Sequence, residues 1–324
     1  MSERSLQPDT DLVYGLFYGV FKPNLIRLAL QLDVFTPLAD GTVTAQGVAK
    51  ACACQPEGIQ ALLEYLCSLL VLDRSGETFA LTPTAATFFV RGRKSYVGDL
   101  ILHDTSPVFF ERVRGALMSG MPSALGIDFV QDAWLESYRT WRISSSLEMW
   151  EAAGIHPGPQ LGLRLMDIAC GCAIKSLSLA QLSPRVRLTC LDTEQVLEVA
   201  RNLAERMGAA SQVAYLPGNL HEINLGEDCY EAALLGQISH YLTEAEVQAL
   251  FRRIYTALTS AGRLLIDCPM AGGAQPEEAA FLSLMLLANS GGRAYSFENY
   301  RGWLRAAGFT EVWQLSERWL VARK

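Results

Sequence analysis

The chain has 324 residues, of which 50% are hydrophobic, and it carries a formal net charge of −7. Single hydrophobic cores rarely grow beyond about 250 to 300 residues, so this length predicts two domains. The hydrophobic content is too high for a disordered chain. The negative charge argues against a nucleic acid partner, because phosphate binding needs clustered Lys and Arg.

The sequence shows no targeting or membrane-spanning segment. The start, MSERSLQPDTD, is polar, and no apolar run reaches the roughly 18 residues that a membrane span needs. Of the eight cysteines, the close pairs Cys52/Cys54 and Cys170/Cys172 lack the usual zinc spacing. We therefore expect packing thiols, no metal site, no membrane association and a soluble, cytoplasmic protein.

The first part of the chain has the pattern of a winged helix. Residues 10–35 have apolar positions at helical spacing, and Pro23 restarts the pattern as a first-turn proline. Thr44 suits the N-cap of a short helix, and Pro56 stands near the start of a second one. Two short extended pieces follow around the turn RSGE. Helix, turn, helix and hairpin in this order are typical of winged-helix domains.

The charges of this region argue against DNA binding. Between Thr44 and Val90 the basic residues are Lys50 and Arg74, against four acidic residues, and the helix that follows Pro56 has no cation. A recognition helix without cations gains nothing from counterion release. The apolar helices before residue 40 are instead expected to bury against a second copy of the chain, which gives a two-fold dimer.

The sequence pattern of the remaining residues changes twice. Residues 96–161 look helical and rich in aromatic side chains. From residue 162, short apolar strands such as LRLMDIA, VRLTCLD and YEAALLG alternate with helices, which predicts a parallel, doubly wound sheet. The tail TEVWQLSERWLVARK reads as two extended pieces, which predicts an antiparallel addition to that sheet. The predicted parts are 1–95, a winged-helix-like domain; 96–161, a helical linker; and 162–324, an α/β domain.

The stretch LMDIACGCAIKSLSLA, residues 165–180, reads as a strand, a small-residue turn and a helix. In doubly wound sheets the ligand lies beyond the carboxyl ends of the central strands, where Asp167 ends the first strand and Asp192 the second. A carboxylate at the second position commonly accepts ribose hydroxyls, although DTEQ also suits a helix cap.

The turn itself argues for a nucleoside rather than a dinucleotide. A pyrophosphate needs several glycines so that backbone N–H groups can approach it. Here the comparable positions are Ala169, Gly171 and Ala173. A nucleoside without phosphates makes a smaller demand, and S-adenosylmethionine is one.

The chain as a whole resembles the two-domain S-adenosylmethionine-dependent O-methyltransferases that act on small molecules in plants and bacteria. LALQLDVFTPLADG and FALTPTAATFF are similar to the family's dimerisation domain, DIACGCA to its glycine motif and CLD to its ribose-binding acid. GNL stands where the family usually has Gly-Asp near the adenine, and QISHYLTEAEVQALFRRIYTALTSAGRLLIDCPM and GGRAYSFENYRGWLRAAGF match its last segments. The resemblance implies a Rossmann-like class I methyltransferase domain with a seven-stranded, mostly parallel sheet, behind an N-terminal winged-helix-like dimerisation domain.

The resemblance implies that His240 is the catalytic base and that Asp267 orients it. From the residues alone, His240 follows a strand on the ligand side, and a free imidazole titrates near 6.5, which suits proton abstraction; a helix-capping role is the alternative. The family's second acid is replaced by Ala294, its Arg or Lys before the histidine segment by Gln237, and its adenine-site Asp by Asn219, whose amide can still accept a hydrogen bond.

The predicted cofactor site comprises residues at the strand ends: Asp167, Ala169, Gly171, Asp192, Gly218, Asn219, Leu220 and Gln237. The predicted acceptor site, where the two domains meet, comprises Trp141, Met149, Trp150, Met270, Met285 and Asn289. The expected partners are a second copy of the chain and a hydrophobic small molecule.

Three interpretations of the function are open. The first is S-adenosylmethionine-dependent O-methylation of an aromatic or polyketide-like small molecule in secondary metabolism. The second is a family member that keeps the cofactor but catalyses hydroxylation, decarboxylation or a pericyclic reaction. The third is a non-catalytic dimeric binding protein. Product analysis with the purified protein separates the first two.

Overall fold

The computed structural model describes residues 9–93, 95–104, 107–120, 145–273 and 276–324. The chain divides into two compact units, residues 1–109 and residues 110–324. Helix α7 (Pro107–Ser119) crosses the border between them. The finer division of the sequence, with borders after residues 95 and 161, stays a prediction.

The first unit combines helices with a small antiparallel sheet. Its helices are α1 (Thr10–Gly19), α2 (Phe21–Gln31), η1 (Thr36–Leu38), α3 (Ala45–Ala51), α4 (Pro56–Ser68), α5 (Pro83–Phe88) and α6 (Gly98–Asp104). Its strands β1 (Val43–Thr44), β2 (Leu72–Ser75) and β3 (Thr78–Leu81) pair in the order β1-β3-β2. Thr44 Oγ1 accepts a hydrogen bond from the Gly47 N–H at 3.3 Å, so the predicted N-cap of α3 is confirmed. Pro56 begins α4, as the pattern predicted.

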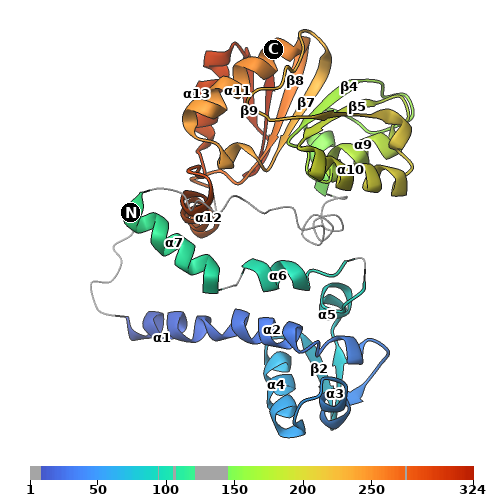
Figure 1. Ribbon diagram of the computed structural model, residues 1–324, viewed down its shortest axis with the longest axis vertical. Coiled ribbons are helices and arrows are strands. Elements are labelled where there is room, and N and C mark those ends of the chain that lie inside the picture. Colours follow the sequence, from blue (N-terminus) through green and yellow to red (C-terminus); the bar gives the residue numbers. More distant parts are fainter. Residues whose placement is uncertain (1–8, 94, 105–106, 121–144, 274–275) are drawn as a thin grey trace. The chain divides into compact units, whose positions relative to one another are not determined.

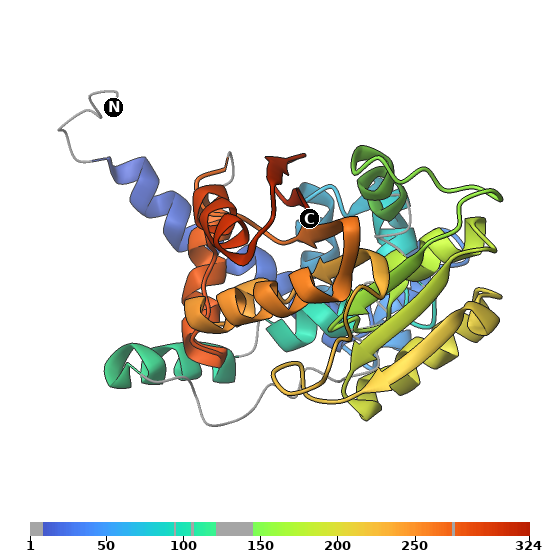
Figure 2. The ribbon, with the colours of Figure 1, turned by 90° about the horizontal axis from the view of Figure 1, so that it is seen from above.

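Helix α1 is apolar and exposed in the single chain. It follows nearly the same line as α2 and extends away from α3, α4 and α5 (Figures 1 and 2). None of its residues is buried, and Val13 and Leu16 are 65% and 71% exposed. Helix α2, by contrast, packs Ala29 and Leu30 into the core of the first unit. A contiguous exposed apolar surface of this kind is typical of an interface.

The second unit is built on a seven-stranded sheet. Its strands are β4 (Arg164–Ile168), β5 (Arg187–Asp192), β6 (Val213–Pro217), β7 (Tyr230–Gly236), β8 (Leu258–Asp267), β9 (Glu311–Gln314) and β10 (Trp319–Arg323). They lie in the order β6-β5-β4-β7-β8-β10-β9. Strands β4 to β8 are parallel, whereas β10 pairs antiparallel with both β8 and β9. The expected α/β class, mostly parallel sheet and antiparallel tail are confirmed.

Helices cover both faces of this sheet. They are α9 (Ile174–Leu182), α10 (Glu194–Arg206), α11 (Glu244–Ala257) and α13 (Phe297–Ala307), and a further helix, α12 (Pro276–Asn289), lies between β8 and α13 in the sequence. Successive side chains of a strand point to opposite faces, and in β4 Leu165 packs with α9 and α10 whereas Met166 packs with α11 and α13. Figure 1 shows these two helix pairs on opposite sides of the strands. Helix α12 was not predicted from the sequence.

The strand order reverses at β4. From β4 the chain proceeds outward to β5 and β6, and it then returns to place β7 and β8 on the other side. Ligands of doubly wound sheets bind outside the carboxyl ends of the strands at such a reversal. The turn between β4 and α9 and the ends of β5 and β7 are therefore where a ligand site is expected.

None of the described helices has the length and apolarity to cross a bilayer. Within the described residues, no three His, Cys, Asp or Glu side chains are grouped so that they could hold a metal ion. The eight cysteines are free thiols. Burial raises the pKa of the Cys172 thiol and raises that of Cys268 to about 11, so both stay protonated, as packing thiols should.

Candidate active site

The backbone of the turn between β4 and α9 has a conformation that is typical of glycine, although two of its positions are alanines. Ala169, Gly171 and Ala173 have φ angles of 53°, 56° and 56°, all in the left-handed region. This conformation brings the Cβ of an L-residue close to the following carbonyl oxygen and costs about 1–2 kcal/mol for a residue other than glycine. The two alanines therefore keep the backbone shape of the motif at some expense in stability.

Asp192 is held by the backbone of this turn. Its Oδ2 accepts a hydrogen bond from the Gly171 N–H at 3.0 Å, and its Oδ1 accepts one from the Thr193 N–H at 2.8 Å. Burial raises the pKa of the carboxyl, and the two N–H donors oppose that rise. The N-cap residue of α10 is Thr193, so Asp192 is not simply a helix cap. A carboxylate has about four acceptor positions, which leaves Asp192 two for a ligand.

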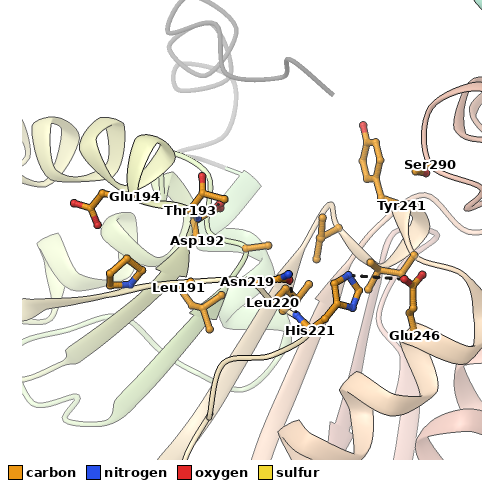
Figure 3. Close-up of a pocket in the computed structure, with 15 residues that line it drawn as sticks. Leu191, Asp192, Thr193, Glu194, Asn219, Leu220, His221, Tyr241, Glu246 and Ser290 are labelled. Atoms are coloured by element: carbon orange, nitrogen blue, oxygen red, sulfur yellow. Dashed lines mark hydrogen bonds and ion pairs between the residues drawn. The ribbon is translucent and has the colours of Figure 1, made fainter. Parts of the chain in front are cut away.

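A pocket of about 940 Å³ lies beside Asp192. It is lined by residues from the carboxyl ends of β4 to β7, from α11 and from the residue that follows α12: Ala169, Leu191, Asp192, Thr193, Glu194, Pro217, Gly218, Asn219, Leu220, His221, Ile238, Tyr241, Leu242, Glu246 and Ser290. Figure 3 shows Asp192, Thr193 and Glu194 on one side, Tyr241 and Ser290 on the other, and Asn219 between them. The volume lies within the range of about 300–1,000 Å³ that is usual for small-molecule sites.

Five of the predicted cofactor residues line this pocket, namely Ala169, Asp192, Gly218, Asn219 and Leu220. Asp167, Gly171 and Gln237 are not among its lining residues. Asp167 is buried beneath the turn, where its Oδ2 accepts a hydrogen bond from Ser176 Oγ at 2.5 Å. Burial raises the pKa of Asp167 to about 7. The position of Asp167 favours support of the turn over direct contact with a ligand in this pocket.

The loop after β6 contributes residues that the sequence analysis missed. Asn219 Oδ1 accepts a hydrogen bond from the His221 N–H at 2.9 Å, which shapes the loop and leaves one acceptor position for a ligand. His221 lines the pocket, and its Nε2 lies 3.8 Å from Glu246 Oε1 (Figure 3). His221 had no assigned role, although its place immediately after GNL was a signal. Tyr241, next to His240, was missed as well.

His240 lies in a short 3-10 turn, η3 (Ser239–Tyr241), directly after β7. The residue is 3% exposed, and its Nδ1 has no hydrogen-bond partner among the described residues. Burial lowers the pKa of the imidazole to about 4; Asp267 opposes this, while Arg318 and Lys175 add to it. The ring is therefore neutral at pH 7, the form that accepts a proton, but it is a weaker base than a free imidazole. The capping box of α11 is formed by Thr243 and Glu246, so His240 does not cap that helix.

The backbone around His240 is fixed from several sides. A Cβ added to Gly292 would lie 2.1 Å from the His240 carbonyl oxygen, so the GGR segment packs directly against this turn. Ser239 Oγ and Tyr300 Oη are 2.9 Å apart, and Tyr295 Oη donates a hydrogen bond to the Leu242 carbonyl at 2.7 Å. These contacts position the His240 turn through the backbone.

Asp267, at the end of β8, is surrounded by donors. Lys175 Nζ forms an ion pair with Asp267 Oδ2, and Gln237 Nε2 donates to Asp267 Oδ1 at 3.1 Å. The Gln237 N–H also donates to the Asp267 carbonyl at 2.7 Å, and Arg318 Nε lies 3.9 Å from Oδ1. Lys175 was not among the site residues predicted from the sequence. Nothing in the family's sequence motifs predicted a positively charged side chain from α9 next to Asp267.

The predicted acceptor residues fall into two groups. Met149, Trp150 and Met270 are buried in the core of the second unit, and Trp150 Nε1 donates a hydrogen bond to the Lys175 carbonyl at 2.9 Å. None of these three lines the pocket beside Asp192. Trp141 and the side chains of Met285 and Asn289 lie outside the described residues, so their role stays a prediction.

Comparison with known families agrees with this arrangement. The model of the O-methyltransferase domain matches residues 160–310, and that of the O-methyltransferase dimerisation domain matches residues 14–91. The chain belongs to the two-domain S-adenosylmethionine-dependent O-methyltransferase family. The methyl donor is therefore S-adenosylmethionine, as the turn and Asp192 predicted.

Individual relatives are distant but align with more than nine-tenths of the chain. Acetylserotonin O-methyltransferase of Mus musculus is 26% identical, over 94% of this chain and 84% of that protein. The tetracenomycin polyketide synthesis 8-O-methyl transferase of Streptomyces glaucescens is 28% identical, over 91% of this chain and 89% of that protein. The structure of human N-acetylserotonin methyltransferase in complex with S-adenosylmethionine superimposes with a TM-score of 0.80 at 17% identity, over 99% of both chains, and it supports the fold.

Proposed function

We propose that this protein methylates a hydroxyl oxygen of an aromatic or polyketide-like small molecule in secondary metabolism, and that it acts as a homodimer. The observation that carries the proposal is the pocket beside Asp192, in which backbone N–H groups hold a carboxylate with unused acceptor positions. The names of the relatives from Mus musculus and Streptomyces glaucescens, which refer to acetylserotonin and to polyketide synthesis, support a small-molecule acceptor.

The residues at the strand ends fit a nucleoside-type cofactor. S-adenosylmethionine, when bound, supplies a methyl group on a positively charged sulfur. Asp192 would accept hydrogen bonds from the ribose hydroxyls, and the loop that holds Asn219 would border the adenine. The pocket has no Lys or Arg among its lining residues, so it suits an uncharged adenosine better than a phosphate.

His240 takes the proton of the acceptor hydroxyl. Its Nδ1 is enclosed by protein, so Nε2 is the nitrogen that meets the acceptor. Removal of this proton turns a hydroxyl into a far better nucleophile for the methyl group. Because the pKa of His240 is about 4 without ligands, full base strength requires a change in its surroundings, and Asp267 is the negatively charged group that acts on it.

Two further expectations belong to this proposal. The exposed apolar residues of α1 support burial of that helix against a second chain, and a dimer would cover them. The eight free thiols fit a reducing compartment, which supports a cytoplasmic location.

Product analysis tests the proposal. The purified protein is incubated with S-adenosylmethionine and a panel of phenolic aromatic and polyketide-like compounds, each paired with the analogue in which a methoxy group replaces the hydroxyl. Mass spectrometry should show methylation of at least one phenol and none of its methoxy partner. Conversion of a panel member without methyl transfer would favour the non-methylating interpretation, for which the alanine at position 294 is the supporting observation. Absence of cofactor binding would contradict both.

A further inference from the structure

Lys175 occupies an unusual place for a charged side chain. It lies in the first turn of α9, directly after the β4–α9 turn, and its side chain is only 12% exposed. Its Nζ pairs with Asp267 at the end of β8, and a Cβ added to Gly236, at the end of β7, would lie 2.9 Å from that nitrogen. The ammonium group therefore lies beside the carboxyl ends of β7 and β8, next to the reversal of strand order at β4.

Lys175 and the ribose side of the pocket lie on opposite sides of β4. The pocket takes most of its lining from the ends of β5 and β6 and from the segment after β7, and Asp192 marks its ribose side. In the sheet, β4 lies between β5 and β7. A substituent that extends from a ribose at Asp192 away from β6 would point across the β4 turn toward the ends of β7 and β8, where the ammonium group of Lys175 lies. The amino-acid part of the cofactor is such a substituent, and it ends in a carboxylate.

Asp267 and His240 differ in their hydrogen bonding. Asp267 is engaged by Lys175 and Gln237, while the buried Nδ1 of His240 has no hydrogen-bond partner among the described residues. Burial of an unpaired polar atom is unfavourable. Three charged groups act on the ring: Asp267 from β8, Lys175 from α9 and Arg318 from the turn between β9 and β10. In the sheet Asp267 pairs with Gly236, four residues before His240, so release of Lys175 would leave the Asp267 carboxylate as an acceptor for a proton on Nδ1.

We propose that Lys175 binds the carboxylate of the cofactor's amino-acid part, and that its departure from Asp267 frees that side chain to accept a hydrogen bond from His240 Nδ1. Lys175 is then a positioning residue, which couples occupancy of the cofactor site to the state of the base. The inference rests on the proposed function, because it requires the cofactor and the role of His240.

Calorimetry with two ligands tests the first half. S-adenosylhomocysteine has the amino-acid carboxylate, whereas 5′-methylthioadenosine has the same nucleoside without it. Lys175→Met should weaken binding of S-adenosylhomocysteine by about 10- to 100-fold, the scale of a charge-assisted hydrogen bond, and leave binding of 5′-methylthioadenosine at the wild-type level. Arg318→Met, which removes the other cation near Asp267, is the matched control and should change neither affinity.

The outcomes are distinguishable. Equal weakening of both ligands, or no weakening of either, would overturn the inference while leaving the proposed function intact. Failure of the wild type to bind either ligand would contradict the proposed function instead. If Lys175→Met does not fold, the pair Lys175→Met/Asp267→Asn leaves no unpaired buried charge, and the same ligand comparison decides the question.

Nuclear magnetic resonance tests the second half without turnover. The chain has four histidines, so a spectrum of His240→Gln assigns the His240 signal. Saturation with S-adenosylhomocysteine should raise the pKa of His240 in the wild type, because a carboxylate partner favours the imidazolium. Saturation with 5′-methylthioadenosine should not. A pKa of His240 that does not respond to S-adenosylhomocysteine would overturn the coupling.

Discussion

Two regions at the carboxyl edge of the sheet in the second unit differ in whether their polar groups are available to a ligand. At the ends of β5 and β6, Asp192 is held by two backbone donors, and its unused acceptor positions face an open pocket. At the ends of β7 and β8, His240 and Asp267 are both buried, and Asp267 is already engaged by Lys175 and Gln237. The first region has acceptor positions available for a ligand. In the second region Asp267 is paired with protein groups, and His240 Nδ1 has no hydrogen-bond partner among the described residues.

This difference separates binding from chemistry along one edge. The residues proposed to contact the cofactor's nucleoside lie at the ends of β5 and β6, and the proposed base belongs to the segment after β7. Changes in the first region should therefore alter affinity, and changes in the second should alter turnover. Substitutions in the two regions test that division.

His240→Ala should reduce turnover by roughly 10²- to 10⁴-fold, the usual contribution of a positioned base. Cofactor affinity should remain nearly unchanged, because His240 does not line the pocket beside Asp192. Steady-state kinetics on an acceptor found in the panel, combined with calorimetry, measures both quantities. An unchanged rate across pH 6 to 9 would exclude the base role. Asp267→Asn should cost less, because the orientation of the ring is only partly lost.

The burial of His240 should make stability depend on pH. Its pKa is about 4 in the folded chain, against about 6.5 for an exposed imidazole. Between these values the unfolded chain binds a proton that the folded chain does not, so stability falls as the pH drops. From pH 7 to pH 4 the wild type should lose about 3 kcal/mol more than His240→Gln, which cannot titrate there.

Denaturant titrations of the two proteins at both pH values measure this difference. Asp167, whose pKa is raised to about 7, has the opposite sign: its contribution to stability is lost as the pH rises through 7. It is present in both proteins and cancels in the comparison. Equal pH dependence of the wild type and His240→Gln would show that the imidazole is not buried in its neutral form.

Asp192→Ala should weaken S-adenosylmethionine binding by about 1.5–3 kcal/mol, the scale of a hydrogen bond to a charged group. The variant also removes the acceptor of the Gly171 and Thr193 N–H groups. Asp192→Asn is the control for that effect, since its amide oxygen can still accept one of the two bonds. Calorimetry in which Asp192→Ala binds like the wild type would remove Asp192 from the site.

Ala169→Gly should stabilise the protein by about 1 kcal/mol, because glycine adopts φ 53° without strain. Ala173→Gly should gain less, since the Ala173 methyl group is buried in the core and is lost. Ala249→Gly, at an exposed position within α11, is the matched control and should destabilise by about 1 kcal/mol. A loss of stability in Ala169→Gly would mean that the turn is not left-handed in solution.

The sequence predicted those features that depend on neighbouring residues. Alternating apolar strands and helices indicated the parallel sheet, and Thr44 and Pro56 marked helix starts that are observed. Asp192 ends β5 and lines the pocket, as the strand pattern predicted, whereas its contact with the ribose stays a prediction. The two left-handed alanines were not predicted, since alanine has no preference for that conformation and only the geometry of the turn imposes it.

The arrangement around Asp267 could not be predicted in the same way. Lys175 and Asp267 are far apart in the sequence, and their pairing depends on the register of β4, β7 and β8. The depressed pKa of His240 likewise follows from packing by the GGR segment and α13. Helix α12 was missed because its apolar residues are spread around the helix rather than gathered on one face.

The most direct test of the division between binding and chemistry is the single-turnover rate of methyl transfer, measured against cofactor concentration for the wild type, Asp192→Ala and His240→Ala. Asp192→Ala should regain a rate close to that of the wild type once S-adenosylmethionine saturates the enzyme. His240→Ala should stay slow by roughly 10² or more at every cofactor concentration. Recovery of His240→Ala at high cofactor, or failure of Asp192→Ala to recover, would contradict the account.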